Sequence, residues 1–401
     1  MGVYEDLGVR RVINGSGTLT RLGGSRMAPE VLAAMCEAAE SFVHIDELQE
    51  QAGRVIAEIT GADAGYVVSG AAAGLTLGIT ACVAGLDVAK MDRLPDTTGM
   101  KNEVVIQRGH RNAYDHAIRA AGVRIVEVGY LGYPGAGGTY PWQIEEAITE
   151  HTAAVACPIL DTPGTVPLRE VCKIAHAKGV PVIVDAAAEL PPRANLRRFI
   201  AEGADLVTFS GGKAIGGPQA SGILAGRRDL IASVALQHQD MDVRAETWSK
   251  RWMIATGQIK GVPQQGLCRS MKVGREEIVG LITALRRFAA GSDEADLAHW
   301  NSVLDVVEPF LADLPGITLT RITPARRPIP LLHLDIDARV VGLNASEVST
   351  RLLSGEPAVA VSESYAELGR LTVNPHGLTA EEAETVGRRL REVLARDLAG
   401  T

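Results

Sequence analysis

The chain has 401 residues, of which 46% are hydrophobic and 22% charged, the composition of a globular protein with a large core and room for two domains. Its formal net charge of −8 argues against a broad nucleic-acid-binding or anionic-membrane surface, although it is compatible with a local basic patch. Five scattered cysteines without C-x-x-C spacing, and an N-terminus without an apolar signal region, indicate a reducing compartment and hence a cytoplasmic protein.

Residues 1–45 are expected to form an N-terminal segment that precedes the first domain. Residues 11–29 are rich in glycine and are predicted to be irregular, whereas residues 29–39 have the pattern of a helix with Pro29 in its first turn. A second helix is expected at about residues 45–60, because Gly61 follows it as a typical C-terminal cap.

Residues 46–270 alternate strand-like and helix-like patterns and are predicted to form a large α/β domain. The expected strands are 65–69, 103–107, 123–128, 152–160, 180–185 and 206–209. The expected helices are 70–84, 112–121, 141–151, 168–178 and 196–202, with a polar loop at 87–101. This repeated β–α unit predicts a mostly parallel sheet that is covered by helices on both faces.

One run in this domain could be mistaken for a membrane helix. Residues 64–86 carry no charge, and Gly70, Gly74 and Gly78 have the four-residue spacing of packed transmembrane helices. The run is poor in Leu, Ile and Phe, so we interpret it as a buried strand followed by a buried helix that packs closely on a sheet.

The alternation stops at about residues 237–265, a stretch with Trp248 and Trp252 that is a candidate for a subunit contact. A long amphipathic helix at 271–290 then begins a smaller α+β domain, residues 271–401. Its further expected elements are a helix at 296–314, strands at 317–322 and 329–336, a helix at 344–353, strands at 358–361 and 371–374, and a helix at 379–398.

Three strand ends of the large domain carry groups suited to chemistry, and ligands of parallel sheets bind at such ends. At the first, Ser69, Gly70 and Ala71 lead from a strand into a helix, where bare N–H groups suit a phosphate. At the second, Asp185 follows Val182-Ile-Val, where a carboxylate serves as a helix cap, a metal ligand or the partner of a protonated ring nitrogen. Each of these turns is common in α/β proteins when taken alone.

The third strand end carries Lys213 among Gly, Ala, Ser and Pro, which is typical either of a surface turn or of a partly desolvated, nucleophilic amine. A P-loop is excluded, because Val207 and Ala214 stand where that motif needs Gly and Ser or Thr. Lys213 lies 28 residues after Asp185, the length of one β–α–β crossing, so the two are expected on neighbouring strand ends. Phosphate site, acid and lysine in this order predict pyridoxal 5′-phosphate (PLP) as the cofactor.

Four segments carry a resemblance to a known family. They are Val12-Ile-Asn-Gly-Ser-Gly17, Glu103-Val-Val-Ile-Gln-Arg-Gly-His110, Val182-Ile-Val-Asp185 and Thr208-Phe-Ser-Gly-Gly-Lys213-Ala-Ile-Gly-Gly-Pro-Gln-Ala-Ser-Gly222. The chain resembles fold-type-I PLP enzymes of the selenocysteine synthase-like branch, which includes bacterial L-seryl-tRNA selenium transferases and D-glucosaminate-6-phosphate ammonia lyases. The resemblance covers roughly residues 8–375.

The resemblance implies a role for each matching position. It makes Lys213 the lysine that binds the cofactor aldehyde and Asp185 the partner of the ring nitrogen. It assigns the phosphate to Ser69, Gly70, Ala71 and Ser210. Thr162 follows another strand end and is a candidate for a hydrogen bond to the phenolic oxygen. Candidates for binding the substrate carboxylate are Arg26, which aligns with an arginine of the family, Arg370 and Arg21. The resemblance places His110 over the pyridine ring, where the selenium transferases carry an acidic residue. His110 and His116 lack a suitably spaced third ligand, so no metal site is expected.

The expected reaction is removal of ammonia from a β-hydroxy amino acid or amino-sugar acid by α,β-elimination, which gives a 2-keto acid. A racemase, aldolase or transaminase would use the same three groups, so the residues alone leave these alternatives open. A tRNA-dependent selenium transferase and a non-catalytic PLP-binding protein also stay open. The family motif begins at Ile13, without room for a preceding tRNA-binding region, so a small-molecule substrate and no nucleic acid are expected. The resemblance further implies a homodimer or a higher homo-oligomer.

Overall fold

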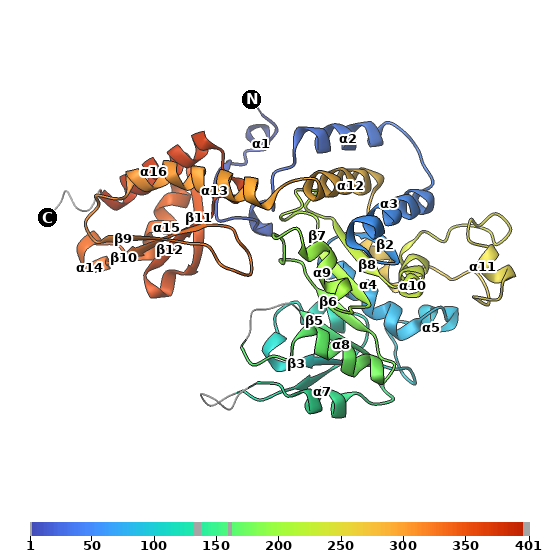
Figure 1. The fold of residues 1–401 in the computed structure, drawn as a ribbon. Helices are drawn as coiled ribbons and strands as arrows, with labels where there is room; N and C mark the ends of the chain where they lie inside the picture. The colour runs from blue at the N-terminus through green and yellow to red at the C-terminus, as the bar shows by residue number, and fades with distance from the viewer. Residues whose placement is uncertain (1, 132–137, 159–162, 396–401) are drawn as a thin grey trace. The chain divides into compact units, whose positions relative to one another are not determined.

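The computed structural model describes residues 2–131, 138–158 and 163–395, and the chain divides into two compact units (Figure 1). The larger unit is Met27–Ala290, and the smaller combines Met1–Arg26 with Gly291–Thr401. These limits differ from the boundaries expected at residues 45 and 270, because the first 26 residues group with the C-terminal part.

A seven-stranded sheet forms the centre of the larger unit. In spatial order its strands are β2 (Ala64–Val68), β8 (Gly222–Gly226), β7 (Leu206–Ser210), β6 (Val182–Asp185), β5 (Thr152–Pro158), β3 (Glu103–Gln107) and β4 (Arg124–Val128). Neighbouring strands from β7 to β4 run parallel, and β8 runs antiparallel to both β7 and β2. The predicted mostly parallel sheet is therefore confirmed.

Helices surround this sheet in the larger unit. They are α2 (Pro29–Ala39), α3 (Ile45–Thr60), α4 (Ala71–Ala84), α5 (Val88–Arg93), η2 (Arg108–His110), α6 (Asp115–Arg119), α7 (Pro141–Ala147), α8 (Leu168–Ala177), α9 (Asn195–Ala201), α10 (Arg228–His238), α11 (Trp252–Ala255), η3 (Leu267–Met271) and α12 (Arg275–Ala289). Side chains alternate along each strand, so β6 sends Val184 into one apolar core and Ile183 into another. Burial on both faces explains why these strands are almost wholly apolar.

The uncharged run at 64–86 forms β2 and the buried helix α4. A side chain at Gly74 would collide with the Thr208 hydroxyl, and one at Gly78 with Ile183, so these glycines let α4 lie directly on the sheet. Among the described residues, no helix has both the length and the apolar character required to cross a membrane. The glycine spacing therefore serves packing inside an α/β unit, as predicted.

The smaller unit contains a five-stranded sheet in the order β1 (Val12–Gly15), β11 (Ala358–Tyr365), β12 (Arg370–Val373), β10 (Leu331–Ile336) and β9 (Ile317–Ile322). Its helices are α1 (Val3–Asp6), η1 (Thr20–Leu22), α13 (Asp293–Val307), η4 (Glu308–Phe310), α14 (Ala338–Val341), α15 (Ala345–Ser354), η5 (Ala366–Leu368), η6 (Pro375–Gly377) and α16 (Ala380–Ala395). One sheet face packs with α13, α15 and α16 around Leu304, Leu334, Leu352 and Leu390.

Three local predictions were wrong. Residues 11–29 are not wholly irregular, because β1 pairs in parallel with β11, and Val12 stands opposite Ala358. The expected loop at 87–101 contains α5, whose first turn is capped by the Asp87 carboxylate. The helix expected from residue 271 begins at Arg275, because η3 occupies residues 267–271.

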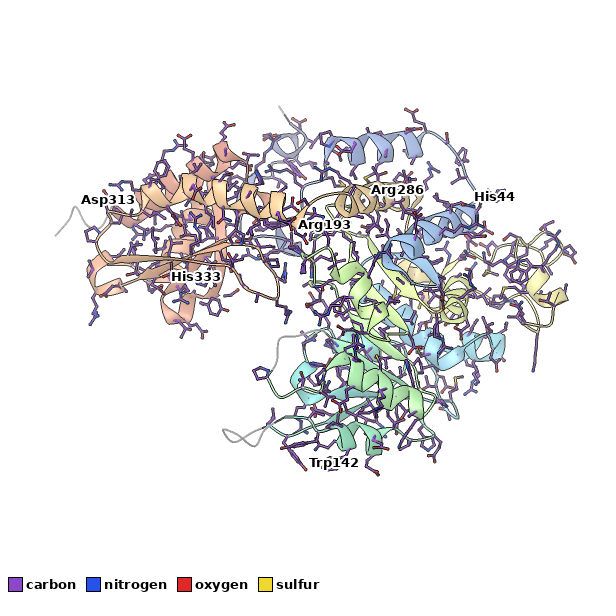
Figure 2. All side chains as sticks on the ribbon, viewed as in Figure 1. His44, Trp142, Arg193, Arg286, Asp313 and His333 are labelled. Atoms are coloured by element: carbon purple, nitrogen blue, oxygen red, sulfur yellow. The ribbon has the colours of Figure 1, made fainter. Side chains whose placement is uncertain are left out.

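A side-chain contact ties α12 to the segment that follows β6. Arg193 Nε donates a hydrogen bond of 2.6 Å to the carbonyl of Phe288, and its guanidinium lies 4.6 Å from the centre of the Phe288 ring (Figure 2). The chain that leaves the carboxyl end of β6 is thereby fastened to the end of α12.

Candidate active site

The carboxyl ends of β5, β6 and β7 lie side by side at one edge of the large sheet. Pro158 is in register with Asp185, and Asp185 with Thr208. Ser210 ends β7 two residues later. Because the three strands are parallel, the side chains that follow them gather at this edge.

Asp185 and Lys213 interact electrostatically, as the spacing in the sequence predicts. Burial raises the pKa of the Asp185 carboxyl, while a 3.0 Å hydrogen bond from the Ala187 N–H and the charge of Lys213 act in the opposite direction. The structure therefore places a half-buried carboxylate within electrostatic reach of an amine, at the ends of neighbouring strands.

Lys213 lies in a loop that closes on its own backbone. The N–H of Gly211 donates to the Ser221 carbonyl at 2.8 Å, and the N–H of Gly217 donates to the Gly211 carbonyl at 2.9 Å. The Ser221 hydroxyl adds a hydrogen bond of 2.5 Å to the Pro218 carbonyl. These bonds define the path of the backbone that presents Lys213.

The predicted phosphate turn begins α4. Gly70 has a φ of 117°, a conformation that favours glycine, and α4 starts at Ala71. A Cβ on Gly222 would lie 2.9 Å from the Gly70 carbonyl carbon and 3.0 Å from the Ala71 nitrogen. Since Gly222 is in register with Ser210, the start of α4 lies near the end of β7.

The Ser69 hydroxyl donates a hydrogen bond of 2.8 Å to the carbonyl of Met271 in η3. The exposed N–H groups of a helix N-terminus and the hydroxyls of Ser69 and Ser210 are all donors of the type that a phosphate accepts. Helix α4 contains no acidic or basic residue, so no side-chain charge of its own opposes an anion at this end.

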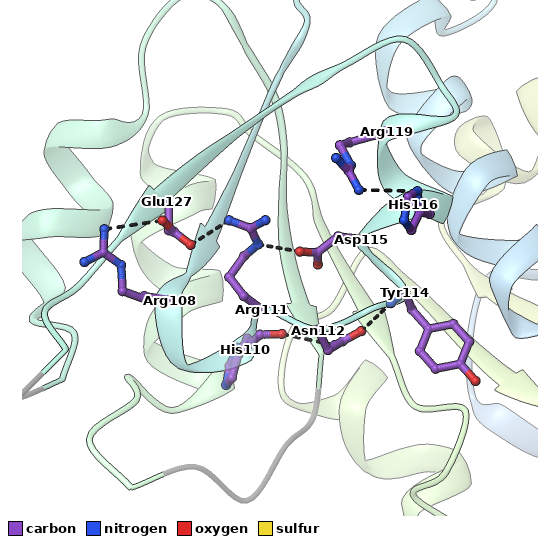
Figure 3. A network of polar contacts seen from close by, with 9 residues as sticks. All are labelled: Arg108, His110, Arg111, Asn112, Tyr114, Asp115, His116, Arg119 and Glu127. Carbon is purple, nitrogen blue, oxygen red and sulfur yellow. Dashed lines mark hydrogen bonds and ion pairs between the residues drawn. The ribbon is translucent and has the colours of Figure 1, made fainter.

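His110 ends η2, directly after β3, and is 3% exposed (Figure 3). Its Nδ1 has no hydrogen-bond partner among the described residues, and burial lowers the pKa of its imidazole to about 4. The ring is thus neutral at physiological pH. It lines a cavity of about 410 Å³ together with residues of β5, α8 and α9, including Cys157, Leu168 and Arg198.

Ion pairs hold the segment that carries His110 (Figure 3). Glu127 on β4 accepts hydrogen bonds from Arg111 at 2.6 Å and from Arg108 at 3.3 Å, and Arg111 also pairs with Asp115. The carbonyl of His110 accepts a bond of 3.1 Å from the side-chain amide of Asn112.

The three arginines expected to bind a substrate carboxylate all lie in the smaller unit. Arg26 pairs with Glu382 at 2.6 Å, Arg370 with Asp335 at 2.8 Å, and Arg21 with Glu363 at 3.8 Å. Each would have to exchange its protein carboxylate for that of a substrate. Thr162 lies outside the described residues. Within the described ranges, no group of three His, Cys, Asp or Glu residues is arranged to hold a metal ion.

Sequence reasoning missed three positions that shape this site. Ala187 contributes a backbone N–H, Met271 contributes a backbone carbonyl, and Gly222 contributes the absence of a side chain. Only Gly222 leaves a signal in the sequence, because glycine at the start of an apolar strand indicates close approach of another backbone.

Three comparisons relate the chain to known proteins. The family model for L-seryl-tRNA selenium transferase matches residues 12–246, more than half of the chain. The D-glucosaminate-6-phosphate ammonia lyase of Salmonella typhimurium is 34% identical over 398 residues, covering 98% of this chain and 97% of that protein. The 5′-C-glycyluridine monooxygenase-decarboxylase of a Streptomyces species is also 34% identical, over 401 residues, covering 98% of this chain and 92% of that protein.

A solved structure of a D-glucosaminate-6-phosphate ammonia-lyase has a TM-score of 0.81 to this chain at 33% identity, covering 100% of this chain and 99% of the other. The resemblance to the selenocysteine synthase-like enzymes and the fold of the type-I PLP enzymes are thereby confirmed. The similarity extends through both compact units, well beyond the motifs that first indicated it.

Proposed function

The chain belongs to the L-seryl-tRNA selenium transferase family of PLP-dependent enzymes, and we propose that it is an ammonia lyase acting on a β-hydroxy amino acid or amino-sugar acid. The full-length similarity to D-glucosaminate-6-phosphate ammonia lyases carries this proposal. The acidic balance of the chain, with a net charge of −8, favours a small-molecule substrate over a tRNA.

The residues at the strand ends fit the cofactor. Asp185 offers a half-buried carboxylate to the pyridine nitrogen, and Lys213, which interacts with it electrostatically, offers an amine to the aldehyde. The start of α4 with Ser69 and Ser210 offers donors to the phosphate. The buried, unsatisfied Nδ1 of His110 indicates that a further group fills the space beside it. When bound, PLP supplies an electron sink for the bonds at the substrate Cα.

Each protein group then has a defined task. Lys213, once the substrate amine has displaced it from the aldehyde, would accept the proton from Cα and later deliver a proton to the departing β-hydroxyl. Asp185 keeps the ring nitrogen protonated by accepting its hydrogen bond, and the interaction with that cation favours the carboxylate form. His110, which is neutral because its pKa is about 4, would add no positive charge that opposes ring protonation if it lay over the bound cofactor.

The overall reaction needs no oxidant or reductant. The Cα–H and Cβ–O bonds break, water leaves, and one water molecule hydrolyses the released enamine. The products are a 2-keto acid and ammonia, and together they have the composition of the substrate, because the water that leaves from Cβ is balanced by the water that enters at Cα. Arg26, Arg370 or Arg21 binds the substrate carboxylate after exchanging its present carboxylate partner.

A second candidate reaction follows from the equally similar Streptomyces protein, whose name describes a monooxygenase and decarboxylase. That chemistry breaks the bond from Cα to the carboxylate and consumes dioxygen, whereas the proposed elimination breaks the Cα–H bond. The same Lys213 and Asp185 serve either route, so the distinction must come from product analysis.

The assembly and location complete the proposal. We expect a homodimer or a higher homo-oligomer, with residues 237–265 in the contact, because Trp252 there is 52% exposed. No nucleic acid is expected as a partner. None of the five cysteines, all within the described part of the chain, forms a disulfide, which supports a reducing, cytoplasmic location.

The test is a screen of the purified holoenzyme with serine, threonine, D-glucosaminate and D-glucosaminate 6-phosphate. Ammonia, 2-keto acid, carbon dioxide and dissolved oxygen are measured together. The lyase releases ammonia and keto acid in equal amounts without oxygen uptake, and in deuterated water its keto acid carries deuterium on the carbon that was Cβ. Carbon dioxide release with oxygen uptake favours the decarboxylase. Cα–H retained in every case rejects elimination.

A further inference from the structure

A chain of partly or fully buried hydrogen bonds extends from Ser69, at the proposed phosphate site, through η3 and α10 to β2. Ser69 Oγ donates to the Met271 carbonyl at 2.8 Å, and His238 Nε2 contacts the same carbonyl oxygen at 2.9 Å. His238 Nδ1 in turn lies 3.0 Å from the hydroxyl of Tyr66. Tyr66 is 3% exposed and His238 is 4% exposed.

The chemistry of these groups determines the direction of each hydrogen bond. A carbonyl only accepts, so His238 Nε2 must carry a hydrogen. Burial is the main cause that lowers the pKa of His238, and the ring is therefore neutral with a bare Nδ1. Nδ1 consequently accepts from the Tyr66 hydroxyl. The Met271 carbonyl thus sets the tautomer of His238, and Tyr66 stabilises that tautomer by donating to Nδ1.

The Met271 carbonyl therefore has two donors, and one of them is also needed elsewhere. The Ser69 hydroxyl has a single hydrogen, and in the structure it is directed to Met271. To bind a phosphate oxygen as a donor, Ser69 must turn that hydrogen away. If Ser69 were the only donor to the Met271 carbonyl, this carbonyl would lose its hydrogen bond inside the protein, which disfavours the rotation of the Ser69 hydroxyl.

We propose that His238, in the tautomer that the Met271 carbonyl sets and Tyr66 stabilises, is a positioning residue for the cofactor phosphate, because it keeps the Met271 carbonyl hydrogen-bonded when Ser69 turns its hydroxyl toward that phosphate. The proposal rests on the proposed phosphate site at Ser69. It gives a role to a buried histidine that the elimination chemistry leaves without one.

The backbone around Met271 is held in place by a second set of contacts. Helix α10 ends at His238 and η3 ends at Met271. The excursion of the chain between these two elements carries α11 (Figure 1). Arg269 of η3 pairs with Asp240, which follows α10, at 3.1 Å, so this ion pair joins the two ends of the excursion. A Cβ on Gly266 would lie 2.5 Å from the Gln237 carbonyl oxygen. The carbonyl is therefore a fixed acceptor, and the hydroxyl is the part that turns.

A double-mutant cycle tests the coupling between His238 and Ser69. The cofactor is removed from purified holoenzyme and titrated back as PLP, and its Kd is obtained from the visible absorbance. His238→Leu should raise this Kd about tenfold. Without PLP, Ser69 still donates to the Met271 carbonyl in this variant. With PLP bound, Ser69 donates to the phosphate and the Met271 carbonyl has no donor. In the Ser69→Ala background the carbonyl is orphaned in both states, so His238→Leu should change the Kd by less than about twofold.

Conservative variants separate this role from a general structural one. His238→Gln retains an N–H donor for Met271 and an acceptor for Tyr66, and it should restore the Kd. Tyr66→Phe should raise the Kd by a smaller factor than His238→Leu, since it only releases the tautomer. Thr80→Val is the matched control: Thr80 is buried next to Cys268 of η3 and donates to Leu77, so the Kd should not change.

Equal increases in Kd from His238→Leu in both backgrounds would overturn the proposal, as would no increase in either. If His238→Leu does not fold, Tyr66→Phe in the two Ser69 backgrounds supplies the cycle, with a smaller increase in Kd that should again disappear in the Ser69→Ala background. Failure of the cofactor site itself is distinguishable, because the wild-type protein would then show no cofactor absorbance at any PLP concentration.

Discussion

Adding one methyl group at Gly222 should weaken cofactor binding. Gly222 begins β8 in register with Ser210, and a Cβ there would lie 2.8 Å from the Phe209 carbonyl oxygen, 2.9 Å from the Gly70 carbonyl carbon and 3.0 Å from the Ala71 nitrogen. All three neighbours are backbone atoms, so no side chain can rotate away to make room. The Gly222→Ala variant must therefore shift the start of α4 away from β8.

The start of α4 contributes both to the packing of the fold and to the proposed phosphate site, so Gly222→Ala should change both the stability and the Kd for PLP. Overpacking of this kind destabilises a fold by about 1–3 kcal/mol. A displaced helix N-terminus also weakens the N–H bonds to a charged phosphate, which are worth about 1.5–3 kcal/mol each. Loss of one such bond raises the Kd for PLP by about tenfold or more.

The assay combines a PLP titration with thermal unfolding of the protein without cofactor. Gly261→Ala is the matched control, because no described atom lies within 4 Å of the added Cβ, and both quantities should stay unchanged. A Gly222→Ala protein with a lowered Tm but an unchanged Kd would refute the link between this glycine and the phosphate site. An unchanged Tm as well would refute the steric reasoning.

Three further substitutions test the proposed roles. Lys213→Ala should abolish the visible absorbance of the covalently bound cofactor in a spectrum of the purified protein, and survival of that absorbance would reject the lysine assignment. Asp185→Asn should retain PLP but lower kcat by about 100-fold or more, because an amide cannot hold the ring nitrogen protonated; an unchanged kcat would contradict this. His110 has a pKa of about 4 in the folded protein, whereas an unfolded histidine protonates below about 6.5. The unfolded state therefore binds more protons between pH 4 and 6.5, and the free energy of unfolding should fall by up to about 3 kcal/mol as the pH drops through that range. Urea unfolding should show a smaller loss for His110→Asn than for the wild type, and equal losses would contradict the assignment.

The position of Asp185 and Lys213 could be predicted because both signals are local. A β-branched run ending in Asp, followed by a loop, a helix and another apolar strand, determines which strand ends are neighbours. The parallel pairing of Asp185 with Thr208 agrees with that reasoning. The direction of β8 had no such signal, since an apolar run has the same pattern in either direction.

Other features depended on contacts between residues that are distant in the sequence. Strand β1 pairs with β11, so Val12 meets Ala358, and a short stretch rich in glycine gave no sign of that partner. The ion pair between Arg26 and Glu382 joins residues 356 positions apart. The role of Met271 is carried by a backbone carbonyl, which every residue type possesses. Such contacts are properties of the fold, and the side chains do not encode them individually.

The glycines of α4 connect this packing to the proposed chemistry. Without side chains at Gly74 and Gly78, the helix lies against Thr208 and Ile183, and its axis comes close to the strands that end in Asp185 and Ser210. Because α4 has no charged residue and is almost fully buried, its dipole is poorly screened by solvent. The field at its N-terminus therefore acts strongly on an anion at the strand ends. The same small residues that made this segment resemble a membrane helix thus place the N-terminus of a buried helix at the proposed phosphate site.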